Sequence, residues 1–503
     1  MKILLISLPD PLGIHVFRFH SAGFGSSFVM PHPKHRYDVY PPIYETYAAA
    51  ILENQGHEVR ILDCQSPNLE IEEILKEIEK AGPSLIVNRI CLPSYYNDLE
   101  IMGKIKETFP DVPQVGWGGI CKVFPEAVLK ESKLDFVFRV VELEEILPEF
   151  AKAHEGNGIE NVAGVSFRKN GEIFHAPNRP FNKNLDAIPL PAYHLLDMRK
   201  YVAQEAHYVP GGSKEKFIPF FSVSGSRGCS FNCVYCPYPV TYGPWRGRSP
   251  EKIADEIEVL VKKYDIHAIW FHGQTFSMVP KRTMHLCDEI IERDLDIHWA
   301  TETRVDRLTP DVIKKMKESG CGRLEVGVET GDQTLLKTVG KRGLTTERVE
   351  KTIEAIKNEG IIAETNFLVG LPGETWEKTK KTAELIKKIN PDILTAMIVT
   401  PYPGTPLFKT AEENSWLLTK DWSKYTLFEP VFDMPNFTAK DMKEAHSYLY
   451  LQYSINKEKM EMLEAFHKFQ IATLAKKLAS NTPKLLSQLP NIIRDRLRKK
   501  EEK

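Results

Sequence analysis

Three cysteines lie close together near the middle of the chain, in the run Ser226-Arg-Gly-Cys229-Ser-Phe-Asn-Cys233-Val-Tyr-Cys236-Pro. Thiolates bind iron, and three of them on one short loop can hold three irons of a cubane cluster, which leaves the fourth iron open. An open iron can chelate the amino and carboxyl groups of a methionine moiety and place its sulfonium beside the cluster. One electron then splits a carbon–sulfur bond, so the loop predicts reductive cleavage of a sulfonium compound.

Zinc is the main alternative occupant of this loop. A structural zinc site closes four ligands in paired short spacings, and no nearby Cys or His completes such a set. The other cysteines are scattered, which is typical of small buried apolar side chains. They are Cys64, Cys91, Cys121, Cys287 and Cys321. Disulfide bonds are not expected, because the chain is long and has no export signal.

Bulk properties limit the function classes. The 66 basic and 68 acidic residues give a formal charge of -2, so no strong field is expected to gather nucleic acid, and a small or neutral substrate fits better. The opening run MKILLISLPD lacks a signal-peptide cleavage site, and no stretch reaches the roughly 18 uncharged apolar residues of a membrane span. A soluble, cytoplasmic protein is expected.

Alternating patterns predict two α/β units. From residue 2 to about 140, the apolar runs ILLISL, VRILDC, SLIVNR and the segment around Val115 alternate with helical patterns at 43–55, 70–80 and 97–108, which favours a Rossmann-like, doubly wound parallel sheet. Gly118 and Gly119 follow the Val115 strand, where a glycine turn at the carboxyl edge of a sheet could admit a ligand. A plain tight turn is the alternative.

A hairpin turn at Asn170-Gly171 and a proline-containing connection indicate a linker before the second unit. Six apolar runs, separated by helical patterns, then predict a partial (β/α)6 barrel of the TIM type. They are FIPFFSVS, HAIWFHG, IHWATET, RLEVGVE, IAETNFLVG and ILTAMIVT. The predicted division is 1–150 for the sheet domain, 151–214 for the linker with its hairpin, 215–410 for the barrel and 411–503 for a helical region. The basic tail from Phe466 to Lys503 fits either contact with a membrane surface or a packed or solvated helix.

The cysteine loop follows the first predicted barrel strand, at the face where barrel active sites lie. The spacing Cys229-x3-Cys233-x2-Cys236, with Tyr235 before the last cysteine, resembles the signature of radical S-adenosylmethionine (SAM) enzymes. The resemblance implies a [4Fe-4S] cluster on the three cysteines, SAM as the compound cleaved, Tyr235 near its adenine, and an electron donor such as flavodoxin or ferredoxin.

Two further motifs follow in the order typical of the family. Gly273 and Gln274, in the run from Phe271 to Ser277, stand where relatives contact the methionine amino group. Relatives usually carry an acidic residue there, whereas Gln274 offers only a neutral acceptor. Arg304 ends the third strand and could pair with the methionine carboxylate through its planar fork. A surface arginine at the barrel end is the alternative.

The later strands add three residues by the same resemblance. Glu329, in Gly-Val-Glu-Thr-Gly, could accept hydrogen bonds from the ribose hydroxyls, since a carboxylate at the carboxyl end of a strand favours a site over a core position. Leu368 and Gly370, in Asn-Phe-Leu-Val-Gly-Leu-Pro-Gly-Glu, resemble the motif whose backbone cradles the adenine.

From residue 1 to about 410 the chain resembles the radical SAM branch with an N-terminal cobalamin-binding domain. Pro41-Pro42, the run Gly56 to Asp63 and Pro401-Tyr-Pro-Gly-Thr-Pro carry this resemblance together with the Gly118-Gly119 turn, which is implied to contact cobalamin. Two features depart from the branch. Val140-Val-Glu-Leu-Glu144 replaces a glycine–glutamate repeat, and the aspartate-x-histidine-x-x-glycine pattern is absent, so that His20 matches only its last part by chance.

The resemblance implies methyl transfer as the leading reaction. One SAM would supply the methyl group through cobalamin, and a second would yield a 5′-deoxyadenosyl radical that removes hydrogen from an unactivated carbon. The alternative keeps the radical step but ends in ring formation, rearrangement or oxidation. A third hypothesis is a cobalamin-binding or iron-sensing regulator without turnover. The substrate is a small molecule, with a slight preference for a hydrophobic or lipid-like one from the basic tail and the near-neutral charge.

Overall fold

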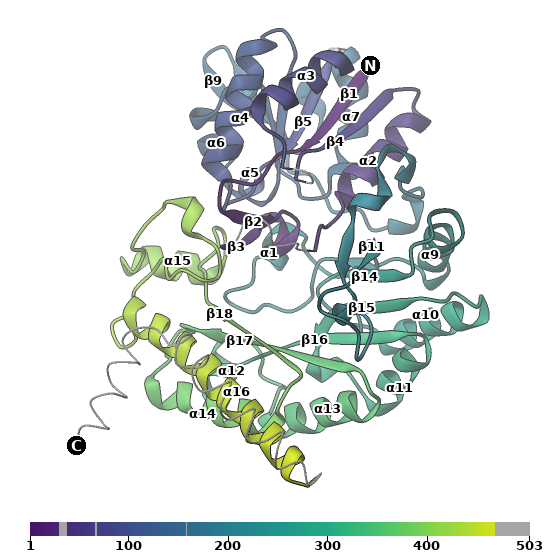
Figure 1. Cartoon of the computed structure of the whole chain (residues 1–503). Coiled ribbons are helices and arrows are strands. Elements are labelled where there is room, and N and C mark those ends of the chain that lie inside the picture. The colour runs from purple at the N-terminus through teal and green to yellow at the C-terminus, as the bar shows by residue number, and fades with distance from the viewer. Residues whose placement is uncertain (30–37, 66–67, 157, 468–503) are drawn as a thin grey trace.

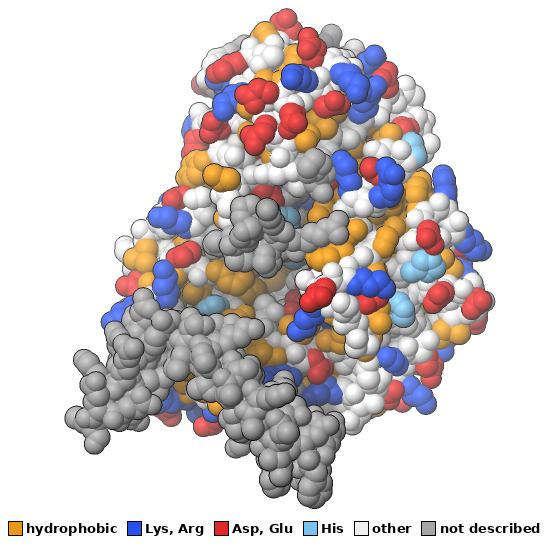
Figure 2. Space-filling model, in the orientation of Figure 1, with side chains coloured by type: hydrophobic (Ala, Val, Ile, Leu, Met, Phe, Trp, Pro, Cys, Tyr) orange, Lys and Arg blue, Asp and Glu red, His pale blue; other side chains and the backbone are white. Residues whose placement is uncertain are grey.

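The structure, a computed structural model, describes residues 1–29, 38–65, 68–156 and 158–467, and side chains as far as residue 458. Two sheets of the chain are stacked, with the N-terminal sheet above the barrel sheet in Figure 1. On the face shown in Figure 2, acidic and basic side chains are interspersed, and hydrophobic side chains gather where the two parts meet.

The N-terminal sheet has the strand order β4-β1-β5-β6-β7-β8-β9, and its first five strands are parallel. The strands are β1 Lys2–Ser7, β4 Glu58–Asp63, β5 Leu85–Arg89, β6 Gln114–Trp117, β7 Phe136–Phe138, β8 Val165–Lys169 and β9 Glu172–His175. The helices are α2 Ile43–Asn54, α3 Ile71–Ala81, α4 Tyr95–Thr108, α5 Gly119–Val123, α6 Pro125–Glu131 and α7 Leu147–Glu155. The predicted Rossmann-like sheet is confirmed, and every residue of β5 is buried, as expected for a strand covered by helices on both faces.

The predicted hairpin extends this sheet. Asn170 and Gly171 have φ values of 51° and 85°, which are typical of the two-residue turn that matches strand twist. β8 pairs antiparallel with β7, so the hairpin forms the sheet edge and is not a free connection. The predicted division of the chain into four segments stays a prediction.

A small ribbon lies between the two sheets and was not predicted. β2 (Ile14–Phe17) pairs antiparallel with β3 (Ser26–Val29), and the short helical segment α1 (His20–Gly23) joins them (Figure 1). Ser21 and Ala22 have φ values of 47° and 59°. Left-handed backbone at residues other than glycine has no sequence signal as clear as a glycine turn, which is why this segment was missed.

The barrel sheet has the order β10-β11-β14-β15-β16-β17-β18. All six predicted strands are present and parallel, and β10 pairs antiparallel with β11, so the predicted partial (β/α)6 barrel is confirmed. The strands are β10 Val202–Gln204, β11 Phe217–Ser224, β14 Ala268–His272, β15 His298–Arg304, β16 Cys321–Glu329, β17 Ile362–Val369 and β18 Ile393–Ile398. The helices are α9 Pro250–Tyr264, α10 Pro280–Glu292, α11 Pro310–Glu318, α12 Gln333–Thr338, α13 Thr346–Asn358 and α14 Trp376–Ile389.

Capping residues determine where the barrel helices begin. Ser249, Thr309, Thr345 and Thr375 each accept a hydrogen bond from a backbone amide of the first helical turn. Such caps contribute about 1 kcal/mol each. They fix the helix starts, and therefore the loops between the carboxyl ends of the strands and the helices.

After β18 the chain continues into α15 (Pro406–Glu413) and the long helix α16 (Ala439–His467). α16 lies across the outside of the barrel in Figure 1, and Asp441 near its start accepts a hydrogen bond from the Trp376 indole at 2.9 Å. The tail to which the membrane-contact prediction refers lies outside the described residues from 468 onward. Within the described part of the chain, no helix combines the length and the apolar character needed to cross a bilayer.

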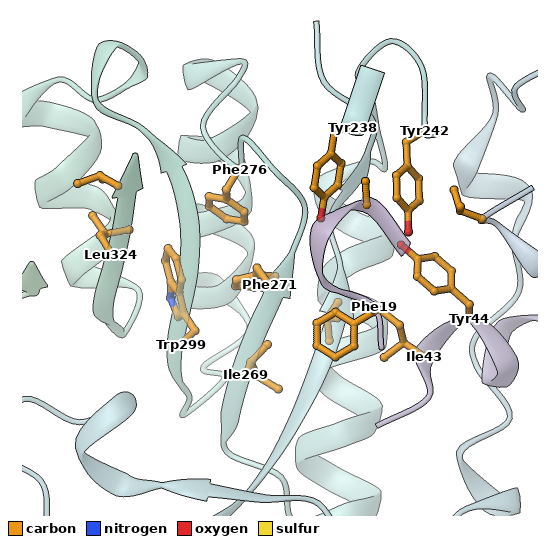
Figure 3. Packing of buried hydrophobic residues seen from close by; sticks show 14 of the residues in the cluster. Phe19, Ile43, Tyr44, Tyr238, Tyr242, Ile269, Phe271, Phe276, Trp299 and Leu324 are labelled. Carbon is orange, nitrogen blue, oxygen red and sulfur yellow. The ribbon is translucent and has the colours of Figure 1, made fainter. Parts of the chain in front are cut away.

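One hydrophobic core continues from the barrel into the contact between the two sheets. In Figure 3, Phe271, Phe276 and Trp299 pack together on the side of the barrel strands opposite the cavity, and the Tyr44 hydroxyl of α2 points toward Tyr242. The five scattered cysteines are buried, as predicted. The two sheets therefore share packed side chains.

Candidate active site

The cysteine loop is held at both ends by backbone contacts. Directly after β11, β12 (Ser226–Arg227) pairs antiparallel with β13 (Arg246–Gly247), and the Cys229 amide donates to the Gly243 carbonyl at 3.0 Å. Gly228 has a φ of 73°, and a Cβ there would lie 2.3 Å from the Pro244 carbonyl oxygen, so only glycine fits this position. Backbone contacts within the chain therefore fix both ends of the loop.

All three cysteines of the loop line one cavity of about 290 Å³ at the carboxyl ends of the barrel strands. Of the other predicted site residues, Tyr235, Gln274, Arg304, Glu329 and Leu368 line the same cavity. Burial raises the pKa of the Cys233 thiol, whereas the nearby charges of Lys341 and Arg304 act to lower it. Three thiol groups beside two cations are a fitting set of ligands for an anionic iron–sulfur cluster.

Arg304 lies beside the cysteines. Its Nη1 is 3.9 Å from Cys233 Sγ, and its guanidinium carbon is 3.7 Å from the centre of the Phe231 ring. Asp306 accepts from Nε and Nη2 at 2.9 and 3.0 Å. The arginine is therefore part of the site and not a surface residue, with Nη1 left on the cluster side.

A β-bulge turns Glu329 into the cavity. The register between β16 and β17 shifts between Gly327 and Glu329, and Glu329 has a φ of 72°. Bulges re-aim side chains, and left-handed backbone at a residue other than glycine is a strain that clusters at functional sites. The Lys341 ammonium donates to Glu329 Oε1 at 2.5 Å and to the Gly327 carbonyl at 2.7 Å. This buried ion pair holds the Glu329 carboxylate in place.

Gln274 is connected to an acidic residue of the next strand. Its Nε2 donates to Glu302 Oε1, and both residues line the cavity. Gln274, which follows β14, is therefore connected to β15 through the Glu302 side chain.

Two predicted site glycines, Gly273 and Gly370, do not line the cavity but pack closely against neighbouring residues. A Cβ at Gly273 would lie 2.6 Å from Ser226 Oγ, and one at Gly370 would lie 2.9 Å from the Met442 sulfur. The Gly370 amide donates to Glu374 at 2.7 Å. These glycines permit close packing, and their predicted ligand contacts stay predictions.

The Gly118-Gly119 turn lies where it was predicted, at the carboxyl edge of the N-terminal sheet, but the chain itself covers it. A Cβ at Gly119 would lie 2.8 Å from the Phe24 ring and 2.9 Å from the Phe24 amide nitrogen. The Leu92 amide donates to the Phe24 carbonyl at 2.7 Å, and the Tyr402 ring stacks on Phe24 with 5.3 Å between centroids. A corrin does not fit at this turn in the closed arrangement, so cobalamin can reach it only if residues 20–25 move.

Comparisons with known proteins identify the family of the chain. Residues 223–386 match the family model of the Radical SAM superfamily, and residues 35–151 match that of the B12 binding domain. An uncharacterized methyltransferase of Pyrococcus horikoshii is 32% identical over 419 residues, which cover 82% of this chain and 87% of the relative. The chain belongs to the radical SAM superfamily, in the branch with a B12 binding domain. The sequence-based identification of the family is confirmed.

Other relatives of this radical SAM enzyme differ in their reactions. An anaerobic magnesium-protoporphyrin IX monomethyl ester cyclase of Rubrivivax gelatinosus is 27% identical over 457 residues, covering 85% of this chain and 79% of the relative. The radical SAM methyltransferase TsrM of Kitasatospora setae, solved with cobalamin and a [4Fe-4S] cluster, has a TM-score of 0.63 at 18% identity, covering 83% of this chain and 76% of that one. The cobalamin-dependent radical enzyme OxsB, solved with aqua-cobalamin and SAM, has a TM-score of 0.69 at 16% identity, covering 96% and 70%. At these identities the two structures confirm the fold.

The carboxylates that replace the glycine–glutamate repeat connect the two domains of the radical SAM enzyme. Arg227 Nη2 donates to Glu144 Oε1 at 2.7 Å, and Arg246 Nη2 donates to Glu142 Oε1 at 2.9 Å. Arg227 Nε is also 3.3 Å from Glu142 Oε1. All four side chains are at most 8% exposed. Glu142 and Glu144, which stand where relatives have the glycine–glutamate repeat, therefore anchor the cysteine loop to the N-terminal domain.

Several cavity residues were missed by sequence reasoning. They include Lys341, Glu302, Arg323, Glu325 and Asn366. Lys341 lies in a connection between helices, where a charge predicts only solvent exposure. The other four had a signal, because polar residues recur at every second position of the strand runs ATETR, GRLEVG and AETNF, which is typical of one polar face.

Proposed function

We propose that this radical SAM enzyme transfers a methyl group to an unactivated carbon of a small-molecule substrate. The proposal rests chiefly on one observation, the three cysteines that open into a single cavity beside Arg304, Lys341 and Glu329. The B12 binding match and the methyltransferase of Pyrococcus horikoshii favour methyl transfer over other outcomes of the radical step.

Cys229, Cys233 and Cys236 would hold the cluster, and the N-terminal sheet would hold cobalamin after residues 20–25 move. When bound, the cluster supplies the electron that splits SAM and cobalamin carries the methyl group. Arg304 Nη1 is free of the Asp306 pair and can orient the SAM carboxylate. Lys341 holds the Glu329 carboxylate oriented to accept from the ribose hydroxyls, and Leu368 offers an apolar wall for the adenine beside Tyr235.

A one-electron donor of the flavodoxin or ferredoxin kind would reduce the cluster. We also propose a cytoplasmic location, because all eight cysteines are unpaired, and unpaired thiols persist in reducing compartments.

A second candidate is a radical cyclase or oxidase without methyl transfer. The similarity to the anaerobic cyclase of Rubrivivax gelatinosus favours it, since that relative covers as much of this chain as the methyltransferase does. The two candidates differ in their nucleoside products. Methyl transfer yields S-adenosylhomocysteine together with 5′-deoxyadenosine, whereas the alternative yields only the latter.

Anaerobic reconstitution with iron, sulfide and hydroxocobalamin tests the proposal. Iron and cobalt contents are measured first, and nucleosides are then identified after reduction with dithionite in the presence of SAM. We expect bound iron and cobalt, 5′-deoxyadenosine, and S-adenosylhomocysteine as well. Cobalt near zero after loading would exclude the methyltransferase and leave the radical enzyme. Absence of 5′-deoxyadenosine would favour a regulator without turnover.

Cys233→Ala is the decisive variant. Losing one ligand to the cluster is expected to abolish stable iron binding and to lower 5′-deoxyadenosine formation more than about 100-fold, beyond the range seen for residues that only support a ligand. Cys121→Ala is the matched control, because this cysteine is buried in the core of the N-terminal domain. Full iron content in the Cys233 variant would contradict the site.

A further inference from the structure

Three glutamates form a row across the inside of the barrel. Glu302 of β15 is in register with Glu325 of β16, which is in register with Glu364 of β17. Registered residues of neighbouring parallel strands point to the same face, with strands about 4.8 Å apart. Glu302 and Glu325 line the cavity, so the row faces its interior.

The row lies deeper in the barrel than the residues proposed to bind SAM. Arg304, Gly327 and Asn366 form the next registered row on this face, and Glu329 and Leu368 lie beyond it toward the cysteines. At about 3.3 Å per residue, the glutamates lie roughly 6–7 Å below the level of Arg304. A group bound there is reached from SAM but lies outside its proposed contacts.

The contacts of the row leave it short of positive charge. Arg323 Nη1 is 3.2 Å from Glu364 Oε2, and the other donors to the row are neutral. These neutral contacts are Asn366 Nδ2 to Glu325 Oε1 at 2.6 Å, Thr395 Oγ1 to Glu364 Oε1 at 2.7 Å, and the Gln274 amide to Glu302. Burial and the neighbouring carboxylates raise the pKa of Glu302 to about 8 and that of Glu325 to about 7. Adjacent carboxylates repel, and a cation in the cavity would relieve the repulsion.

Buried polar atoms next to the row lack partners. Arg323 Nε and Asn366 Oδ1 have no hydrogen-bond partner among the described residues, and both side chains line the cavity. Arg323 is 7% exposed. Because buried polar groups are nearly always satisfied, the unpaired Asn366 acceptor at the cavity wall indicates a bound donor, and the Arg323 donor indicates a bound acceptor such as water. Trp270 and Met397 supply apolar surface beside them.

We propose that Glu302 and Glu325, backed by Glu364, form a substrate subsite for a positively charged nitrogen carried on an apolar body. This inference rests on the proposed function, in which the cavity above the row holds SAM. It replaces a purely hydrophobic or lipid-like substrate with an amphipathic amine or guanidine, whose aliphatic carbons would lie between the row and the SAM level. Glu302 and Glu325 are thus specificity residues and not ligands of SAM.

Binding of simple probes tests the subsite without radical chemistry. The reconstituted enzyme, saturated with SAM and without reductant, is titrated calorimetrically at about pH 8, where an alkyl ammonium stays charged. Pentylamine is the probe, and 1-pentanol and pentanoate are its neutral and anionic counterparts. We expect pentylamine to bind at least about tenfold more tightly than pentanol, and pentanoate more weakly than either, because hydrogen bonds to charged groups are stronger than those between neutral groups.

Two variants and one control complete the experiment. Glu325→Gln and Glu302→Gln are each expected to weaken pentylamine binding about tenfold or more while the affinity for SAM changes less than about twofold. Glu347→Gln, on the exposed face of α13, is the matched control and should bind pentylamine as the wild type does. The iron content of each variant shows whether it is folded. If one of the two variants does not fold, the other is enough to test the subsite.

Three results would overturn the subsite. They are equal affinity for pentylamine and pentanoate, unchanged pentylamine binding in a folded Glu325 or Glu302 variant, and a loss of SAM affinity in those variants that equals or exceeds the loss for pentylamine. The last result would assign the row to the amino group of SAM. Failure of the proposed function is distinct, because it is measured as absent 5′-deoxyadenosine in the reduced wild type, whereas probe binding is measured without reductant.

Discussion

The carboxyl edges of the two sheets face each other, yet they are built in opposite ways. The barrel edge carries a fixed loop and an open cavity with the three cysteines, Arg304 and Glu329. The N-terminal edge ends at the Gly118-Gly119 turn, which Phe24 and its neighbours fill. A site that is already shaped binds without reorganising the protein, whereas a covered site must open first. The cluster and SAM are therefore expected to bind to a ready site, and cobalamin to a site that opens.

The largest expected effect concerns the arginine network that joins the two edges, which consists of Arg227, Arg246, Glu142 and Glu144. Arg227→Met removes the arginine paired with Glu144 and one of the two arginines paired with Glu142, and it leaves the Glu144 carboxylate buried, so we expect the free energy of unfolding to fall by about 3–5 kcal/mol. Urea unfolding measures this loss.

The matched control is an exposed ion pair of the barrel. Lys351→Met breaks the pair with Glu347, and because the two side chains are 74% and 73% exposed, the free energy of unfolding should stay nearly unchanged. Similar losses for the two variants would show that the edges are not joined through the arginine network.

Hydrogen exchange tests the opening of the N-terminal edge. Adding hydroxocobalamin is expected to speed exchange of the Leu92 amide about tenfold, because its bond to the Phe24 carbonyl breaks when the covering segment leaves. The Ile90 amide, which donates to the Trp117 carbonyl within the sheet, should keep its protection. If cobalamin binds while the Leu92 amide stays protected from exchange, the N-terminal edge is also a ready site. The two edges would then not differ in the way described.

The pH dependence of the covering segment gives a smaller effect. Burial lowers the pKa of His20 to about 4, so between about pH 6.5 and pH 4 the open segment binds a proton that the closed segment does not. Closure should therefore weaken as the pH falls, by on the order of 1 kcal/mol at about pH 6. Exchange of the Gly25 amide, which donates to the His20 carbonyl, reports the opening. His20→Gln should remove the pH dependence, and an unchanged profile in that variant would assign it to another group.

Local patterns explain what could be predicted from the sequence. The buried apolar runs of both sheets have a strong period, so the strands were predicted correctly. The spacing of Cys229, Cys233 and Cys236 depends on one short loop, and the three side chains line one cavity, while their role as cluster ligands stays a prediction. Lys341 and the ribbon of β2 and β3 depend on contacts between distant segments, which no local pattern encodes. Gly370 was assigned to the site by its motif, but α16 packs on it from outside the barrel.

The arginine network also limits how this protein can be recombined with its relatives. Arg227 and Arg246 belong to the cysteine loop, whereas their partners Glu142 and Glu144 belong to the N-terminal domain. A chimera that joins this barrel to a foreign N-terminal domain without those carboxylates would bury two uncompensated cations at the base of the cysteine loop. Domain exchange in this enzyme therefore requires the acidic pair to be transplanted with the barrel.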